Sequence, residues 1–419
     1  MSTTGTRIPA ALVLPAWVAA VDLAVAPSDP GRIQPALGPV AARHRGARLL
    51  MTRDGEPLAV VDVGVANGRL DLPELSELSG PWGGDAPATA TGVPTIGLPT
   101  TTVAVCTRDR PEHLAVLLEH LRASPARDVA LLVVDNAPSD DRSRDLVEDV
   151  DRHDPRLHYV REPRPGISWA RDRALAWSAE AGSEVTVFVD DDVTMRAGWL
   201  AAVRTAIAPS DVSCVTGPVF AGTLETGAQL ASDGALGWTV GFTPRRFALD
   251  TPSASPLFPF VPGEYGVGAN FAVRTAEALA LGGFDVHLGA GSPTRGGEDI
   301  EFWVRLVAAG HVLVYAPSTW VWHHHRESDE ALRAQLGGYA RGLGGYLGAV
   351  LCNPTMRRLA VRRLPRVMRH VVRLRRRERA VGVAASDGGF APRAVMGGVG
   401  TYLRLRFTAR RTGAAPRPD

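Results

Sequence analysis

The sequence predicts an α/β fold in which helices cover both faces of a mainly parallel β-sheet. From residue 101 onward, short apolar runs alternate with segments of helical periodicity, a pattern typical of parallel sheets with helical crossovers. The runs Thr102–Cys106, Val129–Val134 and Val185–Val189 are almost continuously apolar, as strands buried on both faces are. Polar clusters directly follow these three runs, at the strand ends where ligands bind in such sheets.

Helices are expected between these strands, and local signals mark some of their starts. Pro111 suits the first turn of a helix, because a proline there loses no intrahelical hydrogen bond. From Ile167 onward, apolar side chains recur at helical spacing. The predicted helices are Pro111–His120, Ser143–Val150, Ile167–Ala181 and Ala197–Ile207, and a further short strand is predicted at Leu157–Val160.

The following stretch of sequence is less regular. Gly, Pro and aromatic residues are frequent between residues 217 and 290, which predicts mostly loops there. Short apolar runs predict strands, and the helical spacing of Ile300, Trp303 and Val307 predicts a helix. We therefore expect one α/β domain over residues 100–330. The elements predicted in its second half are Cys214–Thr216, Asn270–Val273, Asp299–Ala309 (the helix), Val312–Ala316 and Trp320–His324.

The two ends of the chain differ from this central part. Ala47–Met51 and Leu58–Val65 predict two strands, and the Gly-, Pro-, Thr- and Ala-rich stretch Ser79–Pro99 is typical of a linker. We expect residues 1–95 to form a small α+β accessory domain with no recognisable chemistry of its own. Residues 331–419 are expected to form a helical, Arg-rich region.

The composition argues against several classes of protein. The net charge is only +2, and all 46 basic side chains counted as Lys plus Arg are Arg, which we attribute to the coding bias of a GC-rich genome. The three cysteines lie far apart, so a disulfide framework or zinc knuckle is not expected and a reducing compartment is. No run of about twenty apolar residues predicts a spanning helix.

The acidic triplet Asp190-Asp191-Asp192 directly follows the strand Val185–Val189. Three adjacent carboxylates repel one another unless a cation or a positive field offsets their charge. Mg²⁺ and Mn²⁺ favour such oxygen ligands and are typically held by one or two carboxylates together with substrate phosphates. If strand geometry persists, Asp190 and Asp192 point to the same side. The alternatives are a solvated loop and a cap for the following helix.

Glu298 and Asp299 follow two glycines and begin a predicted helix. Acids at a helix start have a purely structural explanation, because they cap the helix and interact favourably with its dipole. The functional alternative is a general base that takes a proton from an attacking hydroxyl.

Three adjacent histidines end a β-like stretch. Strand alternation puts His323 and His325 on one face and His324 on the other. Paired imidazoles would complete a metal site or contact a diphosphate, and the alternative is a surface cluster beside Arg326.

Asp135 and Asn136 end another apolar strand. One interpretation is an Asx turn, helped by Pro138, and the other is hydrogen bonding to a nucleobase or ribose.

Taken in order, these segments resemble the family 2 glycosyltransferases, which have the GT-A fold. The resemblance covers residues 100–330, and the ordered series is far more specific than a single Asp-x-Asp. Two later segments, His323–Arg326 and Gly338–Tyr346, resemble a bacterial subgroup with an extra N-terminal domain. The matching pieces of the main series are Val103-Ala-Val-Cys-Thr-Arg-Asp-Arg-Pro111, Val133-Val-Asp-Asn136, Gly166-Ile-Ser-Trp-Ala-Arg171, Phe188-Val-Asp-Asp-Asp-Val193, Gly198-Trp-Leu200, Gly282-Gly-Phe-Asp285 and Gly297-Glu-Asp299.

The resemblance implies a site for a nucleotide-sugar donor. Thr107 and Asp135 would hold its base and ribose, and Arg108, Asn136 and Arg171 would line the same nucleotide pocket. Two departures from the family pattern blur the preference for one donor: an Asp replaces the common Asn after the pocket arginine, and Ala-Pro-Ser replaces the usual Gly-Ser after the Asp-Asn pair. UDP is the expected nucleotide, with GDP and dTDP left open.

The resemblance also implies a divalent cation, Mn²⁺ or Mg²⁺, that bridges the donor diphosphate. Asp192 would coordinate it, Asp190 would meet the ribose or the metal, and Asp191 would belong to the donor site. His323 or His325 would approach the metal or the diphosphate.

Asp299 would be the catalytic base, with Glu298 beside it. A base opposite the leaving diphosphate predicts an in-line attack that inverts the sugar configuration. The acceptor would be a glycan, a lipid-linked or a small-molecule hydroxyl, for example in a cell-envelope glycan. Two alternatives remain: a sugar nucleotidyltransferase, although no Gly-rich phosphate loop and no lysine is present, and an inactive nucleotide-sugar-binding module.

The segment Met356–Ala380 interleaves arginines with apolar residues. Such a helix can lie on an anionic membrane surface, or it can form an outer layer of the fold. No base-reading motif accompanies it, so a nucleic-acid partner is not expected. The expected location is the cytoplasm, with a peripheral association with the inner face of the cell membrane as one possibility.

Overall fold

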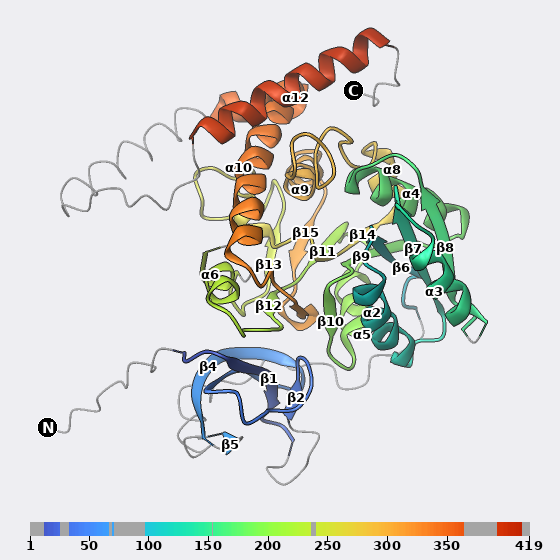
Figure 1. Ribbon diagram of the computed structural model, residues 1–419. Coiled ribbons are helices and arrows are strands. Elements are labelled where there is room, and N and C mark those ends of the chain that lie inside the picture. Colours follow the sequence, from blue (N-terminus) through green and yellow to red (C-terminus); the bar gives the residue numbers. More distant parts are fainter. Residues whose placement is uncertain are drawn as a thin grey trace, which may run out of the picture.

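The computed structural model describes residues 12–25, 33–66, 69–70, 97–152, 154–235, 240–363 and 392–412. Within these ranges the chain forms three β-sheets and a set of helices around the largest sheet (Figure 1). Most of the predicted linker and most of the basic segment 356–380 lie outside the described residues.

The described part of the N-terminal segment is a five-stranded sheet. Its strand order is β2-β1-β3-β4-β5, and β1 pairs with β3 in parallel while the other pairs are antiparallel. The two predicted strands are confirmed as β3 and β4. The strands are β1 (Ala16–Asp22), β2 (Ile33–Pro35), β3 (Gly46–Arg53), β4 (Glu56–Ala66) and β5 (Arg69–Leu70).

An eight-stranded sheet forms the centre of the molecule. Its order is β13-β15-β11-β14-β9-β6-β7-β8, and only β13 and β14 run against the direction of the other six strands. The predicted mainly parallel sheet is thus confirmed. The strands are β6 (Thr101–Thr107), β7 (Val129–Asn136), β8 (Leu157–Glu162), β9 (Val185–Asp190), β11 (Cys214–Thr216), β13 (Arg245–Phe247), β14 (Asn270–Arg274) and β15 (Leu313–Tyr315).

Helices cover both faces of this sheet because alternate side chains of its strands point to opposite sides. Val103 and Val105 of β6 join a core with α2, α3 and α5, whereas Ala104 joins a second core with α4, α8 and α9. The helices are α2 (Pro111–Ala123), α3 (Arg142–Asp151), α4 (Ile167–Glu180), α5 (Trp199–Ile207), α6 (Gly227–Ala235), α7 (Pro262–Tyr265), α8 (Thr275–Ala280) and α9 (Glu298–Ala308).

A three-stranded sheet joins the N-terminal sheet to the central one. Its order is β10-β16-β12, and β16 directly precedes the last two of the three adjacent histidines. Phe220, Trp320 and Trp322 pack from this region into a core with Val18 and Leu50 of the N-terminal sheet. The elements here are β10 (Val193–Met195), β12 (Val219–Ala221), β16 (Val321–His323) and the 3₁₀ turn η2 (Pro317–Thr319).

The prediction missed the regular elements between residues 217 and 265. This stretch contains β12, β13, α6 and α7, where mostly loops were expected. Three of these four elements have only three or four residues, too few to show a helical or strand periodicity in the sequence.

Two long helices follow the central domain. These are α10 (Asp329–Cys352) and α12 (Pro392–Thr412), with a further helical stretch at residues 354–363. α12 lies across α10 at the periphery of the molecule (Figure 1). Among the described residues, no helix is both long and apolar enough to cross a bilayer. All three cysteines are free, as expected.

Candidate active site

The sheet brings the predicted polar clusters together at the carboxyl ends of its parallel strands. β6 lies between β7 and β9, with Thr107 opposite Asp135 and Cys106 opposite Asp190 in register. β9 ends at Asp190, and the chain then turns into β10, which pairs with β16. His323, the last residue of β16, is therefore the register partner of Val193, next to the acidic triplet.

Asp190, Asp192 and His323 form the candidate metal centre. One ligand atom from each lies within 4.8 Å of the other two. His323 Nε2 is 3.1 Å from Asp192 Oδ1, and both side chains are more than 90% buried. The triplet therefore keeps the predicted strand alternation, because the side chains of its first and third acids lie on the same side.

Asp191 points to the other side and has different partners. Thr107 donates a hydrogen bond from Oγ1 to Asp191 Oδ2 at 2.7 Å. Arg110 pairs with Asp191 and also donates from Nη2 to Asp192 Oδ2 at 2.9 Å. Arg110 thus supplies a fixed positive charge that offsets part of the repulsion among the carboxylates.

The remaining charge imbalance shows in the pKa values of the triplet. Desolvation raises the pKa of Asp190 to about 6 and that of Asp191 to about 7, and the neighbouring Asp192 carboxylate adds to both. Burial would also raise the pKa of Asp192, but His323 and Arg110 hold it well below its usual range. Two of the three acids therefore carry their charge only at a cost, which an added cation would reduce.

The other two histidines occupy different positions. The rings of His323 and His325 approach to 3.2 Å between their Nδ1 atoms, so these two share a side as predicted. Only His323 belongs to the candidate metal cluster among the described residues. His324 Nε2 lies 3.4 Å from Thr194 Oγ1 on the opposite side. Burial lowers the pKa of His325 to about 3 and that of His324 to about 4, so both imidazoles are neutral near pH 7.

Arg171 links the metal carboxylates to the acid pair at the start of α9. It is 3% exposed, and its guanidinium lies 3.1 Å from Glu298 Oε1 and 3.8 Å from Asp190 Oδ1. A third contact goes to the carbonyl oxygen of Gly268, at 3.0 Å. The predicted nucleotide-pocket arginine therefore lies between two predicted functional acids and fixes their relative positions.

Asp299 is held by backbone donors. The N–H of Gly268 donates to its Oδ2 at 3.1 Å, and the N–H of Ile300 donates to its Oδ1 at 2.8 Å. Gly268 approaches so closely that a Cβ there would overlap the Asp299 carboxylate. In contrast to the buried Glu298, Asp299 is partly exposed, which leaves it accessible to a substrate.

Glu298 gives a testable pH dependence. Burial raises its pKa to about 7, Asp299 adds to the increase and Arg171 opposes it. A carboxyl group whose pKa rises on folding binds its proton more tightly in the folded state. Its contribution to the free energy of unfolding therefore falls as pH increases from about 4.3, the pKa in the unfolded chain, through the folded pKa. Glu298→Gln is neutral throughout, so we expect this variant to gain thermal stability relative to the natural protein between about pH 5 and 8.

Differential scanning fluorimetry across this pH range in chelator-containing buffer measures the effect. Glu264→Gln on the short helix α7 is the matched control for the replacement of a carboxylate by an amide. A constant difference for Glu298→Gln would contradict the raised pKa.

The two residues of β7 predicted to bind the sugar donor are buried, and other parts of the protein already form some of their hydrogen bonds. Tyr159 OH donates to Asp135 Oδ2 at 2.9 Å, whereas Asp135 Oδ1 has no hydrogen-bond partner within the described part of the chain. Burial raises the pKa of Asp135. Asn136 bonds the Arg164 carbonyl and the Gly166 N–H, each at 2.8 Å, and so shapes the turn before α4.

Several residues at this site escaped sequence reasoning. The predicted Arg108 is half-exposed and pairs with Asp109 at 3.6 Å, whereas Arg110 contacts the triplet. Asp109 has a positive φ of 54°, so the strand alternation does not continue through it. Tyr159 lies two residues before Arg161, which is the register partner of Asp135, so the side chains of Tyr159 and Arg161 share one face of β8. This spacing is the only sequence signal that could have indicated Tyr159 as a site residue.

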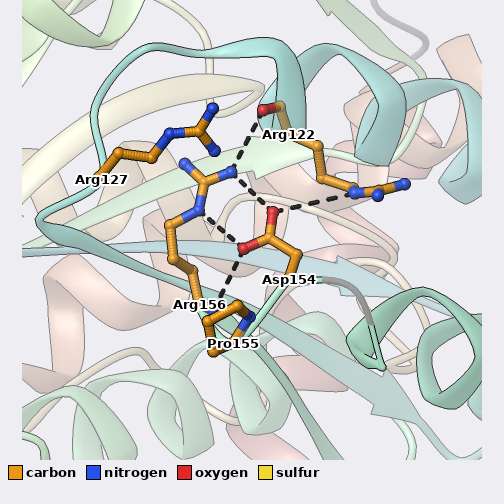
Figure 2. Close-up of a pocket in the computed structure, with 5 residues that line it drawn as sticks. All are labelled: Arg122, Arg127, Asp154, Pro155 and Arg156. Atoms are coloured by element: carbon orange, nitrogen blue, oxygen red, sulfur yellow. Dashed lines mark hydrogen bonds and ion pairs between the residues drawn. The ribbon is translucent and has the colours of Figure 1, made fainter.

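A cavity of about 360 Å³ lies beside the starts of β7 and β8 (Figure 2). Arg156 binds Asp154 there through Nε at 2.8 Å and Nη2 at 2.7 Å, and it also donates to the Ala126 carbonyl. Arg122 and Arg127 complete the lining. The cavity precedes β8, whereas the candidate site follows the ends of the strands parallel to it, so it contains none of the predicted site residues.

A sheet with acidic residues at the ends of its parallel strands is the arrangement expected of the predicted family. Comparison with known proteins agrees with that expectation. Residues 102–259 match the family described as glycosyl transferase family 2. The match confirms, over residues 102–259, the resemblance to family 2 glycosyltransferases seen in the sequence. The match begins in β6 and includes the acidic triplet, and it ends before α9.

Particular relatives carry glycosyltransfer or glycan-synthesis names. The chain is 29% identical over 225 residues to the succinoglycan biosynthesis protein ExoM of Rhizobium meliloti, covering 52% of this chain and 65% of that protein. It is 28% identical over 170 residues to the pre-mycofactocin glycosyltransferase of Mycobacterium tuberculosis, covering 41% of this chain and 32% of the relative. The chain thus spans less than two thirds of either relative.

Two solved structures show a distant likeness. One is the mannosyltransferase PcManGT from Pyrobaculum calidifontis in complex with GDP-Man and Mn²⁺, with 18% identity and a TM-score of 0.44, covering 74% of this chain and 86% of that one. The other is GalNAc-T7 with UDP, GalNAc and Mn²⁺, with 17% identity and a TM-score of 0.43, covering 61% and 48%.

Proposed function

We propose that this chain is an inverting glycosyltransferase that moves a sugar from a nucleotide-diphosphate donor to an acceptor hydroxyl in a single displacement. The observation that carries the proposal is the chain of ion pairs from Glu298 through Arg171 to Asp190, which joins the acid pair of α9 to the candidate metal centre. Such a reaction needs a cation site for the donor diphosphate and a base for the acceptor within one site. The family match supports the same reaction class.

A divalent cation fits the ligands that this site offers. Asp190 and Asp192 supply carboxylate oxygens, and the imidazole of His323 beside them favours Mn²⁺ over Mg²⁺. Burial raises the pKa of Asp190, and this supports the assignment because a bound cation would favour the charged carboxylate. When bound, the cation would act as a Lewis acid that offsets charge on the departing diphosphate.

Asp299 is the proposed base. Its two backbone hydrogen bonds orient the carboxylate without neutralising it, and its partial exposure leaves room for an acceptor hydroxyl. Glu298 is less suited to that task because the buried Arg171 already binds it. We propose that Asp299 accepts the proton while Glu298 and Arg171 hold the start of α9 in place. The product of an α-linked donor would then be β-linked.

The donor nucleotide is proposed to occupy the ends of β6 and β7. The unpartnered Oδ1 of Asp135 would accept an N–H or O–H from the base or ribose. Thr107 at the end of β6 and Asp191 together border this region through their mutual hydrogen bond. We propose UDP as the nucleotide, and a glycan, lipid-linked or small-molecule hydroxyl as the acceptor.

Gly268 provides a test of how precisely the base must be held. A Cβ at this position would displace the Asp299 carboxylate, so we expect Gly268→Ala to lower kcat by about 10- to 100-fold with a much smaller change in donor KM. Gly263→Ala is the control, because a Cβ there meets nothing within 4 Å. Steady-state kinetics of nucleotide release measure both variants, and an unchanged kcat in Gly268→Ala would argue against Asp299 as the base.

A donor screen tests the proposed reaction as a whole. UDP-, GDP- and dTDP-sugars are incubated with the full chain and Mn²⁺, with or without chelator, and the released phosphate species are identified. A glycosyltransferase releases a nucleoside diphosphate, whereas a nucleotidyltransferase exchanges pyrophosphate. Metal-dependent binding without turnover for any donor would identify an inactive binding module. In a separate measurement, the NMR coupling of the product's anomeric proton shows whether the new glycosidic bond is α or β.

A further inference from the structure

The helix α12 has one face anchored to the protein and one face exposed. On the inner face, Gly398 packs so closely against α10 that a Cβ would overlap the Arg341 carbonyl. Tyr402 is 1% exposed and donates a hydrogen bond to Asp285 Oδ2 at 2.8 Å. The helix is therefore fixed by its inner face, and its outer face lies at the periphery of the molecule (Figure 1).

The outer face of α12 combines cations with exposed apolar side chains. Met396 is 69% exposed and Phe407 is 59% exposed, and these are the first and third most exposed large apolar side chains within the described residues. Arg393, Arg404 and Arg411 are also exposed. Together with the two apolar residues they follow one another at spacings of three, eight, three and four residues, which places all five side chains on one side of the helix. The helix contains no Asp or Glu.

The sequence from α10 to the end of α12 is strongly one-sided in charge. Residues 331–412 contain eighteen arginines and only two acids, Glu378 and Asp387, although the whole chain has a net charge of only +2. The rest of the chain is therefore net negative. A further exposed apolar side chain, Leu351 at 54%, lies on the neighbouring α10.

We propose that the outer face of α12 binds an anionic lipid surface, with the helix lying in the plane of the interface. Its arginines would contact acidic headgroups, while Met396 and Phe407 would insert among the acyl chains. A symmetric dimer through this face is disfavoured, because Arg would then face Arg without an acid to pair with. The helix α12 lies outside the segment 356–380 that the sequence indicated, and the role of its outer face does not depend on the transfer reaction.

Cosedimentation of the full chain with vesicles tests this surface. We expect binding to vesicles that mix phosphatidylcholine with phosphatidylglycerol, weak binding to phosphatidylcholine alone, and weakening by added salt. The double variant Met396→Ser/Phe407→Ser should bind the mixed vesicles about tenfold more weakly. Arg404→Gln/Arg411→Gln should also lose about tenfold, and it should lose much of its preference for the anionic lipid.

Matched controls separate this face from general surface effects. Leu249→Ser/Leu279→Ser alters two large apolar side chains that are 40% and 39% exposed in the central domain, and it should bind vesicles like the natural chain. Thermal unfolding and donor hydrolysis without vesicles should be unchanged in all three variants. Unaltered vesicle binding of Met396→Ser/Phe407→Ser would overturn the proposal. So would loss of an oligomer in that variant during size-exclusion chromatography without a change in vesicle binding.

Discussion

Asp299→Asn is expected to lower kcat for sugar transfer by about 1,000-fold, the scale of a lost general base. The donor Kd should stay within about twofold, because the proposed donor contacts lie on other elements and a lost base affects the transition state rather than donor binding. The backbone N–H of Gly268 would face either the oxygen or the amide nitrogen of the new side chain. Thermal unfolding therefore accompanies the kinetics, to separate lost chemistry from lost structure.

The comparison is kcat from nucleoside-diphosphate release and donor Kd from calorimetry with Mn²⁺ present. Asp250→Asn is the control, since that carboxylate is exposed and contacts Thr251 by a side-chain hydrogen bond. Near-normal turnover in Asp299→Asn would remove it as the base and make Glu298 the next candidate. A parallel loss of donor affinity would instead assign Asp299 to the donor site.

Asp192→Asn is expected to weaken metal-dependent donor binding by more than about 100-fold. Loss of a residue that only hydrogen-bonds to a metal ligand already lowers metal affinity or activity by about 10- to 100-fold, and Asp192 is a proposed ligand itself. The variant removes one charge from the centre and leaves His323 without its carboxylate partner. Chelation of the natural chain should reproduce the loss, and the variant should then show little further response to chelator. Calorimetric titration of UDP with and without Mn²⁺ measures both effects.

Adjacent histidines supply the matched control for the metal centre. His323→Ala removes a proposed ligand, whereas His324→Ala alters a side chain directed toward Thr194. We expect the first variant to lower Mn²⁺ affinity clearly and the second to change it little. If both variants reduce the affinity equally, or if Asp192→Asn binds the donor with undiminished metal dependence, the cation is held elsewhere.

Much of the central fold follows from local patterns in the sequence. The predicted strand Cys214–Thr216 has the same bounds as β11, and the helix predicted from Ile167 to Ala181 is one residue longer than α4. Continuous apolar strands and helical repeats are visible within windows of about ten residues, so no knowledge of distant contacts is needed. Elements of three or four residues, such as β12 and α7, leave no such pattern.

The positions of single charges were harder to predict. Arg108 and Arg110 both follow β6, and their order in the sequence does not reveal which one faces the acids. The backbone at Asp109 decides it, because its positive φ breaks the alternation between them. Likewise, alternation places His323 and His325 on one side, but only the pairing of β16 with β10 brings His323 to Asp192.

Hydrophobic periodicity and strand alternation are properties of short segments, so they were enough to predict acidic and polar residues at the ends of buried parallel strands. The sequence also carried the ordered motifs of a family 2 glycosyltransferase. Which of these charges meet depends on how the whole domain packs. Arg171 and Glu298 are 127 residues apart, and their contact depends on how α4 and α9 pack onto the sheet. Contacts of that range are set by packing of the whole domain, and no local pattern encodes them.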